Sequence, residues 1–240
     1  MSIYLGFDPG GAGEFGWCVA QESTDSATGL PLIIVEAGIA MHAKEAVCEA
    51  SQLIPSSELP AAAGIDAPLI WSRGAGRQAE PLLREQIRHA GCGTAEGTVQ
   101  HVNSLRGACV VQGMMTAVLL RERFEEIPLS EAHPKAWLWI AEITNRRPSV
   151  AEITVADLPE WCVSPKSDLR DHQRDAAISC LSSWAMIRRT DGWHDLYQAE
   201  EEGEIYTPLE PPLAYWMPAA RSSREKAKRV RPSVSKGDPR

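Results

Sequence analysis

The sequence lacks the features that mark membrane, secreted and zinc-binding proteins. No apolar run approaches the roughly 18 residues that a membrane-spanning helix needs, and the N-terminal residues do not show the basic and then apolar pattern of a signal peptide. The six cysteines are scattered and no two form a CxxC pair, which argues against a zinc site or a framework of disulfide bonds. We therefore expect a cytoplasmic protein with no membrane partner and with reduced, buried thiols.

The chain does contain enough apolar material for a core, and its charge is unevenly distributed. It has 240 residues, of which 44% are hydrophobic, and a formal net charge of -8. Residues 221–240 carry a net charge of +6, which leaves -14 on the rest of the chain. Because this basic segment has few large apolar residues, we predict that it is disordered. It could assist binding to nucleic acid phosphates or serve only to keep the protein soluble.

The pattern of apolar residues predicts an α/β domain over residues 1–190, with strands and helices in an order typical of mixed sheets. An antiparallel hairpin leads, and parallel crossover connections follow. Residues 191–220 show no clean period, so we predict an irregular extension packed on the domain. The predicted strands cover 3–8, 15–21, 32–40, a run near 61–71 and a run ending near 131, and the main helices cover 43–54, 77–90, 104–124 and 167–189.

Three of the predicted strands end on a carboxylate, namely Asp8, Asp66 and Glu131. Functional groups collect beyond the carboxyl ends of strands in such sheets, and the helix that carries Asp175 can cross the same edge. Like charges raise one another's pKa, so a cation is expected among them. Oxygen ligands suit Mg²⁺ or Mn²⁺, and two such ions about 4 Å apart can activate a water and stabilise the leaving oxygen of a phosphodiester. The pattern predicts metal-assisted hydrolysis.

Further candidates flank these acids. His172 could orient or deprotonate the water, or replace a carboxylate as a ligand. Asp171 precedes Asp175 by one helical turn, so either Asp171 or His172 could complete the metal site. Arg73 and Arg77 follow the fourth strand and could hold substrate phosphates.

Each strand-end acid also has a structural alternative. Asp8 precedes Pro and Gly and could simply cap the turn, and Asp66 precedes Ala-Pro in a similar setting. Glu131 could pair with Lys135. The four acids together favour a shared metal site over these separate roles.

Four motifs, GFDPGGAGEFGWCVA, GIDAPLIW, EAHP and DHQRDAA, occur in an order that resembles the RNase H-like superfamily. The closest resemblance is to the domain-of-unknown-function family of predicted RNase H-like nucleases, over about residues 3–190. It implies a five-stranded mixed sheet flanked by helices, with the first three strands antiparallel. By position, it also implies that the superfamily's acids correspond to Asp8, Asp66, Glu131 and Asp175. The run from His172 to Ala176 is similar to the last helix of RuvC-type Holliday-junction resolvases, where a second acid or a histidine accompanies the final aspartate.

The sequence thus predicts a divalent-metal-dependent nuclease that acts on RNA or DNA with two Mg²⁺ or Mn²⁺ ions. One alternative is a non-catalytic binding or scaffold protein with the same fold, which the acidic body favours. Another is an actin-like phosphotransferase or ATPase, but such proteins normally have two glycine-rich hairpins and this chain has one. The predicted catalytic residues are Asp8, Asp66, Glu131, His172 and Asp175, and the predicted metal ligands are Asp8, Asp66, Glu131, Asp171 and Asp175.

Overall fold

A computed structural model describes residues 1–11, 13–24, 30–72, 76–102, 105–146, 149–158, 160–166, 168–200 and 205–220. The predictions for Arg73 and for the basic segment 221–240 fall outside these residues. The strands are β1 (Ile3–Asp8), β2 (Phe15–Glu22), β3 (Leu32–Ala40), β4 (Ala62–Ile65), β5 (Trp71–Ser72), β6 (Leu129–Glu131), β7 (Cys162–Val163), β8 (Trp193–Asp195), β9 (Ile205–Tyr206) and β10 (Leu213–Pro218). The helices are α1 (Ala43–Gln52), α2 (Ala79–His89), α3 (Ala95–Thr98), α4 (Gly107–Phe124), α5 (Pro134–Ile140) and α6 (His172–Arg188), with 3-10 turns η2 (Ile143–Arg146), η3 (Val150–Glu152), η4 (Val155–Asp157) and η5 (Leu196–Ala199).

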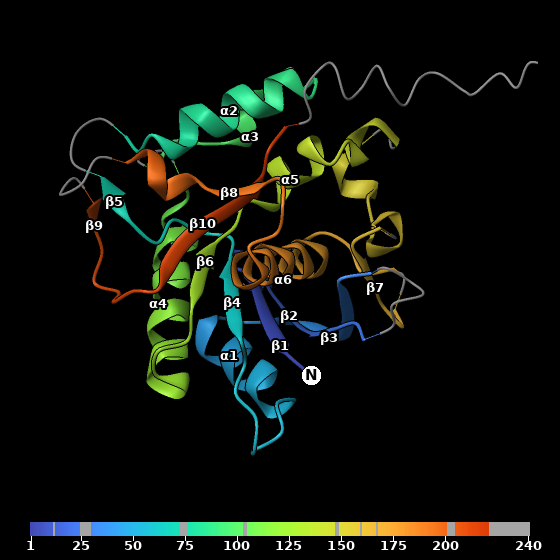
Figure 1. Ribbon diagram of the computed structural model, residues 1–240, viewed down its shortest axis with the longest axis vertical. Helices are drawn as coiled ribbons and strands as arrows, with labels where there is room; N and C mark the ends of the chain where they lie inside the picture. The colour runs from blue at the N-terminus through green and yellow to red at the C-terminus, as the bar shows by residue number, and fades with distance from the viewer. Residues whose placement is uncertain are drawn as a thin grey trace, which may run out of the picture.

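One mixed sheet organises the molecule, and its strands run in the order β7-β3-β2-β1-β4-β6-β10-β8 (Figure 1). Strand β2 is antiparallel to both of its neighbours, β1 and β3, whereas β4, β6 and β10 run parallel to β1. The predicted α/β class and the antiparallel start are therefore confirmed. The predicted count of five strands is wrong, because β7, β8 and β10 extend the sheet to eight strands within the described residues.

Part of this extension comes from the segment 191–220, which we expected to be irregular. Strand β10 pairs with β6, and β8 pairs with β10 at the edge of the sheet. The four central residues of β10 are all buried. Because a strand buried on both sides lacks polar alternation, its sequence gives no period-two signal.

Helices cover both faces of the sheet and divide the core into two clusters. Helices α2, α5 and α6 pack on one side, and α1 and α4 pack on the other. Successive side chains of β1 alternate between these clusters, with Tyr4 on the α6 side and Leu5 and Phe7 on the α4 side. Asp8 ends β1 in the same phase as Tyr4, so its side chain lies on the α6 side. None of the helices in the described ranges has the length and apolar character needed to cross a membrane.

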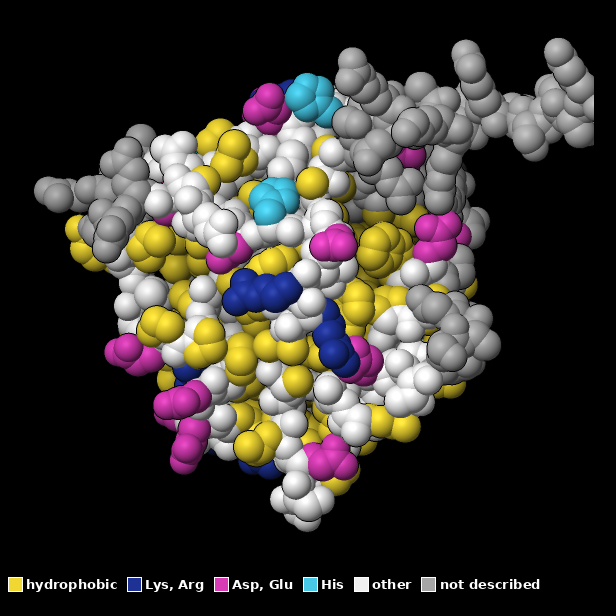
Figure 2. Space-filling model, viewed as in Figure 1, with side chains coloured by type: hydrophobic (Ala, Val, Ile, Leu, Met, Phe, Trp, Pro, Cys, Tyr) yellow, Lys and Arg dark blue, Asp and Glu magenta, His cyan; other side chains and the backbone are white. Residues whose placement is uncertain are grey.

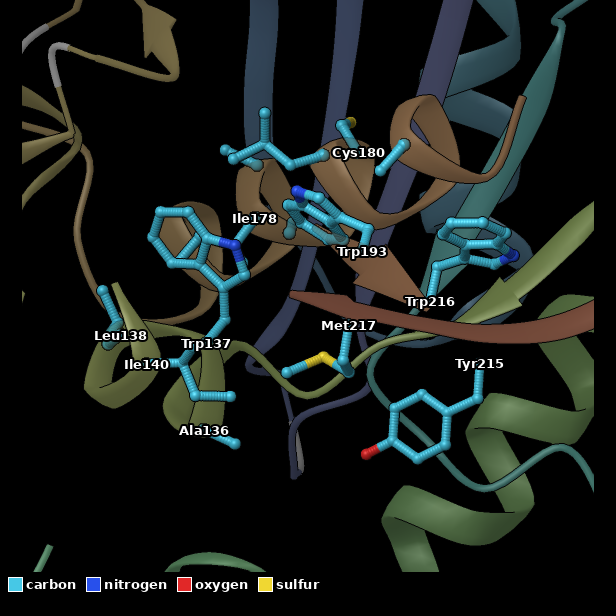
Figure 3. Packing of buried hydrophobic residues seen from close by; sticks show 14 of the residues in the cluster. Ala136, Trp137, Leu138, Ile140, Ile178, Cys180, Trp193, Tyr215, Trp216 and Met217 are labelled. Carbon is cyan, nitrogen blue, oxygen red and sulfur yellow. The ribbon is translucent and has the colours of Figure 1, made fainter. Parts of the chain in front are cut away.

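An aromatic cluster joins the C-terminal strands to the α6 side of the sheet. The rings of Trp137 and Trp161 lie 5.4 Å apart edge to face, and those of Trp161 and Trp193 lie 6.2 Å apart. Figure 3 shows side chains from α5, α6, β8 and β10 meeting here, with Trp216 and Tyr215 on opposite sides of β10. Strands β8 and β10 are thus part of the core, and β10 places Tyr215 beside the end of β6.

Helix α6 approaches the sheet unusually closely because two glycines lie beneath it. Gly6 of β1 and Gly64 of β4 are register partners. A Cβ atom on either residue would lie 1.9 Å from a carbonyl oxygen of α6, that of Ala176 for Gly6 and that of Ser179 for Gly64. No side chain fits at these two positions, so the backbone of the helix rests directly on the strands. The helix begins at His172 and not at residue 167 as we expected.

We predict that Gly64→Ala lowers the free energy of unfolding by about 1–3 kcal/mol, because the added methyl group forces α6 away from β4. The measurement is chemical denaturation followed by tryptophan fluorescence. Gly93→Ala is the matched control, since a Cβ there would meet nothing within 4 Å. Equal stability of the two variants would show that the close contact between helix and sheet is not needed.

Candidate functional site

A cleft of about 430 Å³ opens at the carboxyl ends of β1, β4 and β6. Its wall includes the predicted site residues Asp8, Asp66, Arg77, Glu131, Asp171 and His172. Asp175 does not line the cleft and is only 1% exposed. The topology therefore gathers most of the predicted acids at one edge, with Asp175 buried below.

Asp8, Asp66 and Asp175 interact electrostatically. The backbone of Asp66 continues the pairing of β4 with β1, since its N–H donates to the carbonyl of Phe7 at 2.9 Å. Asp66 lies at the cleft wall and is partly exposed. Desolvation of its carboxyl by the surrounding protein raises the pKa of Asp66 well above the usual range, and the charges of Asp8 and Asp175 raise it further. Burial likewise raises the pKa of Asp175 to about 6, with a contribution from Asp8 that Arg174 opposes. The three carboxylates thus destabilise one another when all are ionised.

His172 contacts the first of these acids. Its Nδ1 atom lies 2.6 Å from Oδ2 of Asp8, and its Nε2 atom lies 3.8 Å from Glu14 and 3.9 Å from Asp171. The hydrogen bond with Asp8 raises the pKa of His172, although partial burial opposes this. Of the two residues that we expected could complete the metal site, Asp171 and His172, it is therefore His172 that contacts a strand-end acid. The side chain of Asp171 is 64% exposed at the cleft wall.

Asp175 is held by the residue that precedes it. The Nε and Nη2 atoms of Arg174 lie 2.7 and 2.5 Å from Oδ1 of Asp175. The same guanidinium donates to the carbonyl oxygens of Val150 and Ile153 at 2.8 and 3.0 Å.

Glu131 has a different environment, because it forms a buried ion pair with Arg77. Two nitrogens of Arg77 donate to its two oxygens at 2.7 and 2.8 Å. Oε2 of Glu131 also accepts from the N–H of Leu69 at 3.1 Å and from the hydroxyl of Tyr197 at 2.5 Å. The alternative pairing with Lys135 is not the one formed.

Arg77 is correspondingly enclosed. Its side chain is 3% exposed, and its Nε donates to Glu80 at 2.6 Å. Burial opposes its charge, but Glu131 and Glu80 outweigh this and raise the pKa of Arg77 well above the usual range. In this arrangement the guanidinium that we expected to hold substrate is occupied by two glutamates.

Strand alternation explains why Glu131 differs from Asp8 and Asp66. Asp8 and Asp66 each follow a glycine two positions earlier, and those glycines face α6. Glu131 is two residues after Leu129 and is the register partner of Ile65, so it shares a face of the sheet with them. Leu129 and Ile65 pack with α1 and α4. The side chain of Glu131 therefore leaves the sheet in the opposite phase.

The donor chemistry around Asp8 and Asp66 fits a hard divalent cation, with Asp175 nearby. The side chain of Asp66 has no hydrogen bond or ion pair to any described residue, so both of its oxygens are available. Glu131 does not fit as a ligand, because its two oxygens accept four hydrogen bonds. Across the described ranges, no three or more His, Cys, Asp or Glu side chains form a group that could already hold a metal ion.

Basic groups near the cleft are few. Lys135 and Arg106 line it, both are exposed, and neither has an ion pair within the described part of the chain. On the face shown in Figure 2, the basic side chains of the described residues do not form a continuous band. Any attraction for phosphate is therefore local.

Comparisons with known proteins give no relative for this chain. Models of protein families, curated protein sequences and solved structures were each compared with it, and none matched.

Our sequence analysis did not predict three residues that contact the site residues, namely Glu80, Arg174 and Tyr197. The spacing of Arg77 and Glu80 at the start of a predicted helix indicates an i, i+3 pair, and Arg174 stands next to Asp175. Tyr197 is 66 residues from Glu131, and no local pattern links them.

We predict that Arg77→Met lowers the free energy of unfolding by about 3–5 kcal/mol, because Glu131 and Glu80 then lie buried without a counter-charge. Denaturation curves measure this. Arg88→Met is the matched control, since Arg88 pairs with Glu96 on the surface, where the loss should be at most about 1 kcal/mol. A small loss for Arg77→Met would contradict a stabilising role for the buried pair.

We predict that Asp66→Asn raises the melting temperature of the protein in EDTA at neutral pH. Because the pKa of Asp66 is higher in the folded protein than in the unfolded chain, ionisation of Asp66 destabilises the fold as the pH rises above the unfolded value of 3.8. The increase in melting temperature caused by Asp66→Asn should therefore be absent near pH 3.8 and should grow above it. Thermal melting across this pH range measures the difference. Glu58→Gln, an exposed carboxylate outside the cleft, should change little, and a pH-independent effect of Asp66→Asn would contradict the argument.

Proposed function

We propose that this protein is a divalent-metal-dependent nuclease with an RNase H-like arrangement of its acids, which hydrolyses phosphodiester bonds in RNA or DNA. The observation that supports this most is the mutual interaction of Asp8, Asp66 and Asp175 beside an open cleft. Buried like charges are costly unless a cation or proton compensates them. A site that keeps three carboxylates together is therefore suited to binding a cation.

Asp8 and Asp66 are the proposed ligands of Mg²⁺ or Mn²⁺. The bound cation would polarise the phosphodiester and lower the pKa of an attacking water. A second ion, as expected from the sequence, would need Asp171 or Asp175 as a further ligand, because Glu131 is held by Arg77. The hydrogen bond to His172 orients the carboxylate of Asp8.

His172 can also move a proton. Its Nδ1 is engaged with Asp8, whereas its Nε2 lies between Glu14 and Asp171 at the cleft wall. In its neutral form, an imidazole held in this way can orient a water or accept its proton. Lys135 and Arg106 provide the positive charge that attracts the substrate phosphate.

A non-catalytic nucleic acid binding or scaffold protein is the second candidate. The occupation of Glu131 by Arg77 favours it, since one of the four expected acids is then not available to a metal. The charge of -14 outside the basic segment favours it as well, because a strongly acidic body repels a polyanion.

We predict that the wild-type protein cleaves a mixture of RNA and DNA oligonucleotides with Mg²⁺ or Mn²⁺, and that Asp8→Asn reduces cleavage to background. Asp168→Asn, an exposed aspartate that does not line the cleft, should cleave like the wild type. Calorimetry with Mn²⁺ should show binding to the wild type and the control only. Equal cleavage by the wild type and Asp8→Asn would remove the assigned site, and Mn²⁺ binding without cleavage would favour the non-catalytic candidate.

A further inference from the structure

We propose that Glu80 forms a second part of the cleft, which recognises the exocyclic amino group of a nucleobase. This inference rests on the proposed function for the identity of the ligand as a nucleotide. It starts from one buried side chain. Glu80 lines the cleft and is 2% exposed. Its Oε1 accepts from Arg77, whereas its Oε2 is buried and has no hydrogen-bond partner among the described residues.

A carboxylate oxygen without a partner is unusual in a folded protein. Burying such an oxygen without a hydrogen bond costs free energy, so nearly all of them find a donor in protein, water or ligand. Burial raises the pKa of Glu80, and the neighbouring Arg77 only partly offsets this. Oε2 lacks a donor within the described part of the chain, and Glu80 itself lines the cleft, which is where we infer that a donor is supplied.

The charge around Glu80 selects the kind of donor. Arg77, Glu80 and Glu131 are in direct contact and together carry two negative charges and one positive charge. This end of the cleft therefore repels phosphate and suits a group that donates an N–H. Lys135 and Arg106 stand elsewhere on the same wall, where they can meet the phosphate.

The size and lining of the cleft match a nucleotide. Its volume of about 430 Å³ falls within the range of roughly 300–1,000 Å³ that is typical of small-molecule sites. Thr98, Val99 and Gln100 line it together with Glu80, which provides both polar and apolar contacts for a base. A base placed at Glu80 would leave its phosphate to point along the cleft toward Asp8 and Asp66.

Among the groups on a base, the exocyclic amine suits a single free carboxylate oxygen. Glutamate accepts from the amino group of cytosine in known modes of base recognition, and adenine and guanine carry comparable amines. Uracil, hypoxanthine and unsubstituted purine lack the amine. Because hydrogen bonds to charged groups are among the stronger ones, we expect an affinity preference of about tenfold or more.

The test uses calorimetry on the full chain with pairs of nucleoside 5′-monophosphates that differ at the amino position. The pairs are guanosine and inosine, cytidine and uridine, and adenosine and purine riboside. We expect the wild type to prefer the amino member of at least one pair by about tenfold, and Glu80→Gln to bring that ratio within about twofold. Glu85→Gln, an exposed glutamate of the same helix, should keep the wild-type ratio. Because each measurement is a ratio, the affinity for phosphate and metal cancels.

Three results would overturn the inference: no binding of any monophosphate, equal affinity within every pair, or a preference that survives in Glu80→Gln. If Glu80→Gln does not fold, a crystal structure of the wild type with the preferred nucleotide decides instead. An amino nitrogen within hydrogen-bond distance of Oε2 of Glu80 supports the inference, and any other position overturns it.

This outcome is separable from that of the proposed function. Metal-dependent cleavage that Asp8→Asn abolishes, together with equal affinity within all pairs, would leave the nuclease in place without the base subsite. An amino preference that depends on Glu80, together with no cleavage under any metal, would retain the subsite in a binding protein.

Discussion

The contact between α6 and the sheet is the constraint on which the rest of the site depends. Two glycines in register allow carbonyl oxygens of the helix to rest where side chains would otherwise stand. This close approach brings the first turn of α6 over the end of β1, so that His172 reaches Asp8 and Asp175 lies near enough to affect Asp66. With a larger residue at either glycine, the helix would have to move outward and the three acids would separate.

A second buried network supports the other side of the cleft. The pair of Arg77 and Glu131 links the start of α2 to the end of β6, and the hydroxyl of Tyr197 adds the C-terminal segment. Each charged group here is nearly removed from water, so each depends on its partners. The cleft therefore lies between two groups of charged residues. One contains Asp66 and Asp175, whose pKa values are raised, and the other is built around Glu131, whose charge is neutralised by Arg77.

The features of the fold that follow from local patterns could be predicted from the sequence. The hairpin of β1 and β2 and the strand ends at Asp8 and Asp66 follow from apolar runs that stop at acids. The joining of β10 to β6 could not be predicted, because the four central residues of β10 are all buried and therefore show no alternation of apolar and polar residues. The place of Glu131 depends on the phase in which β6 enters the sheet, and three residues are too few to reveal it. The capture of Glu131 by Arg77 is a tertiary contact across 54 residues, which no spacing rule indicates.

The pairing of β10 with β6 has a consequence for how this chain can be divided. The domain that we predicted from the sequence ends at residue 190, but the described structure continues the sheet beyond that point with β10 and β8. A fragment that stopped near residue 190 would leave β6 as an open edge with unpaired backbone groups, which is a template for aggregation. It would also lack Tyr197, whose hydroxyl donates a hydrogen bond to Glu131. The smallest unit that keeps both β6 paired and the cleft wall intact therefore extends to the end of β10.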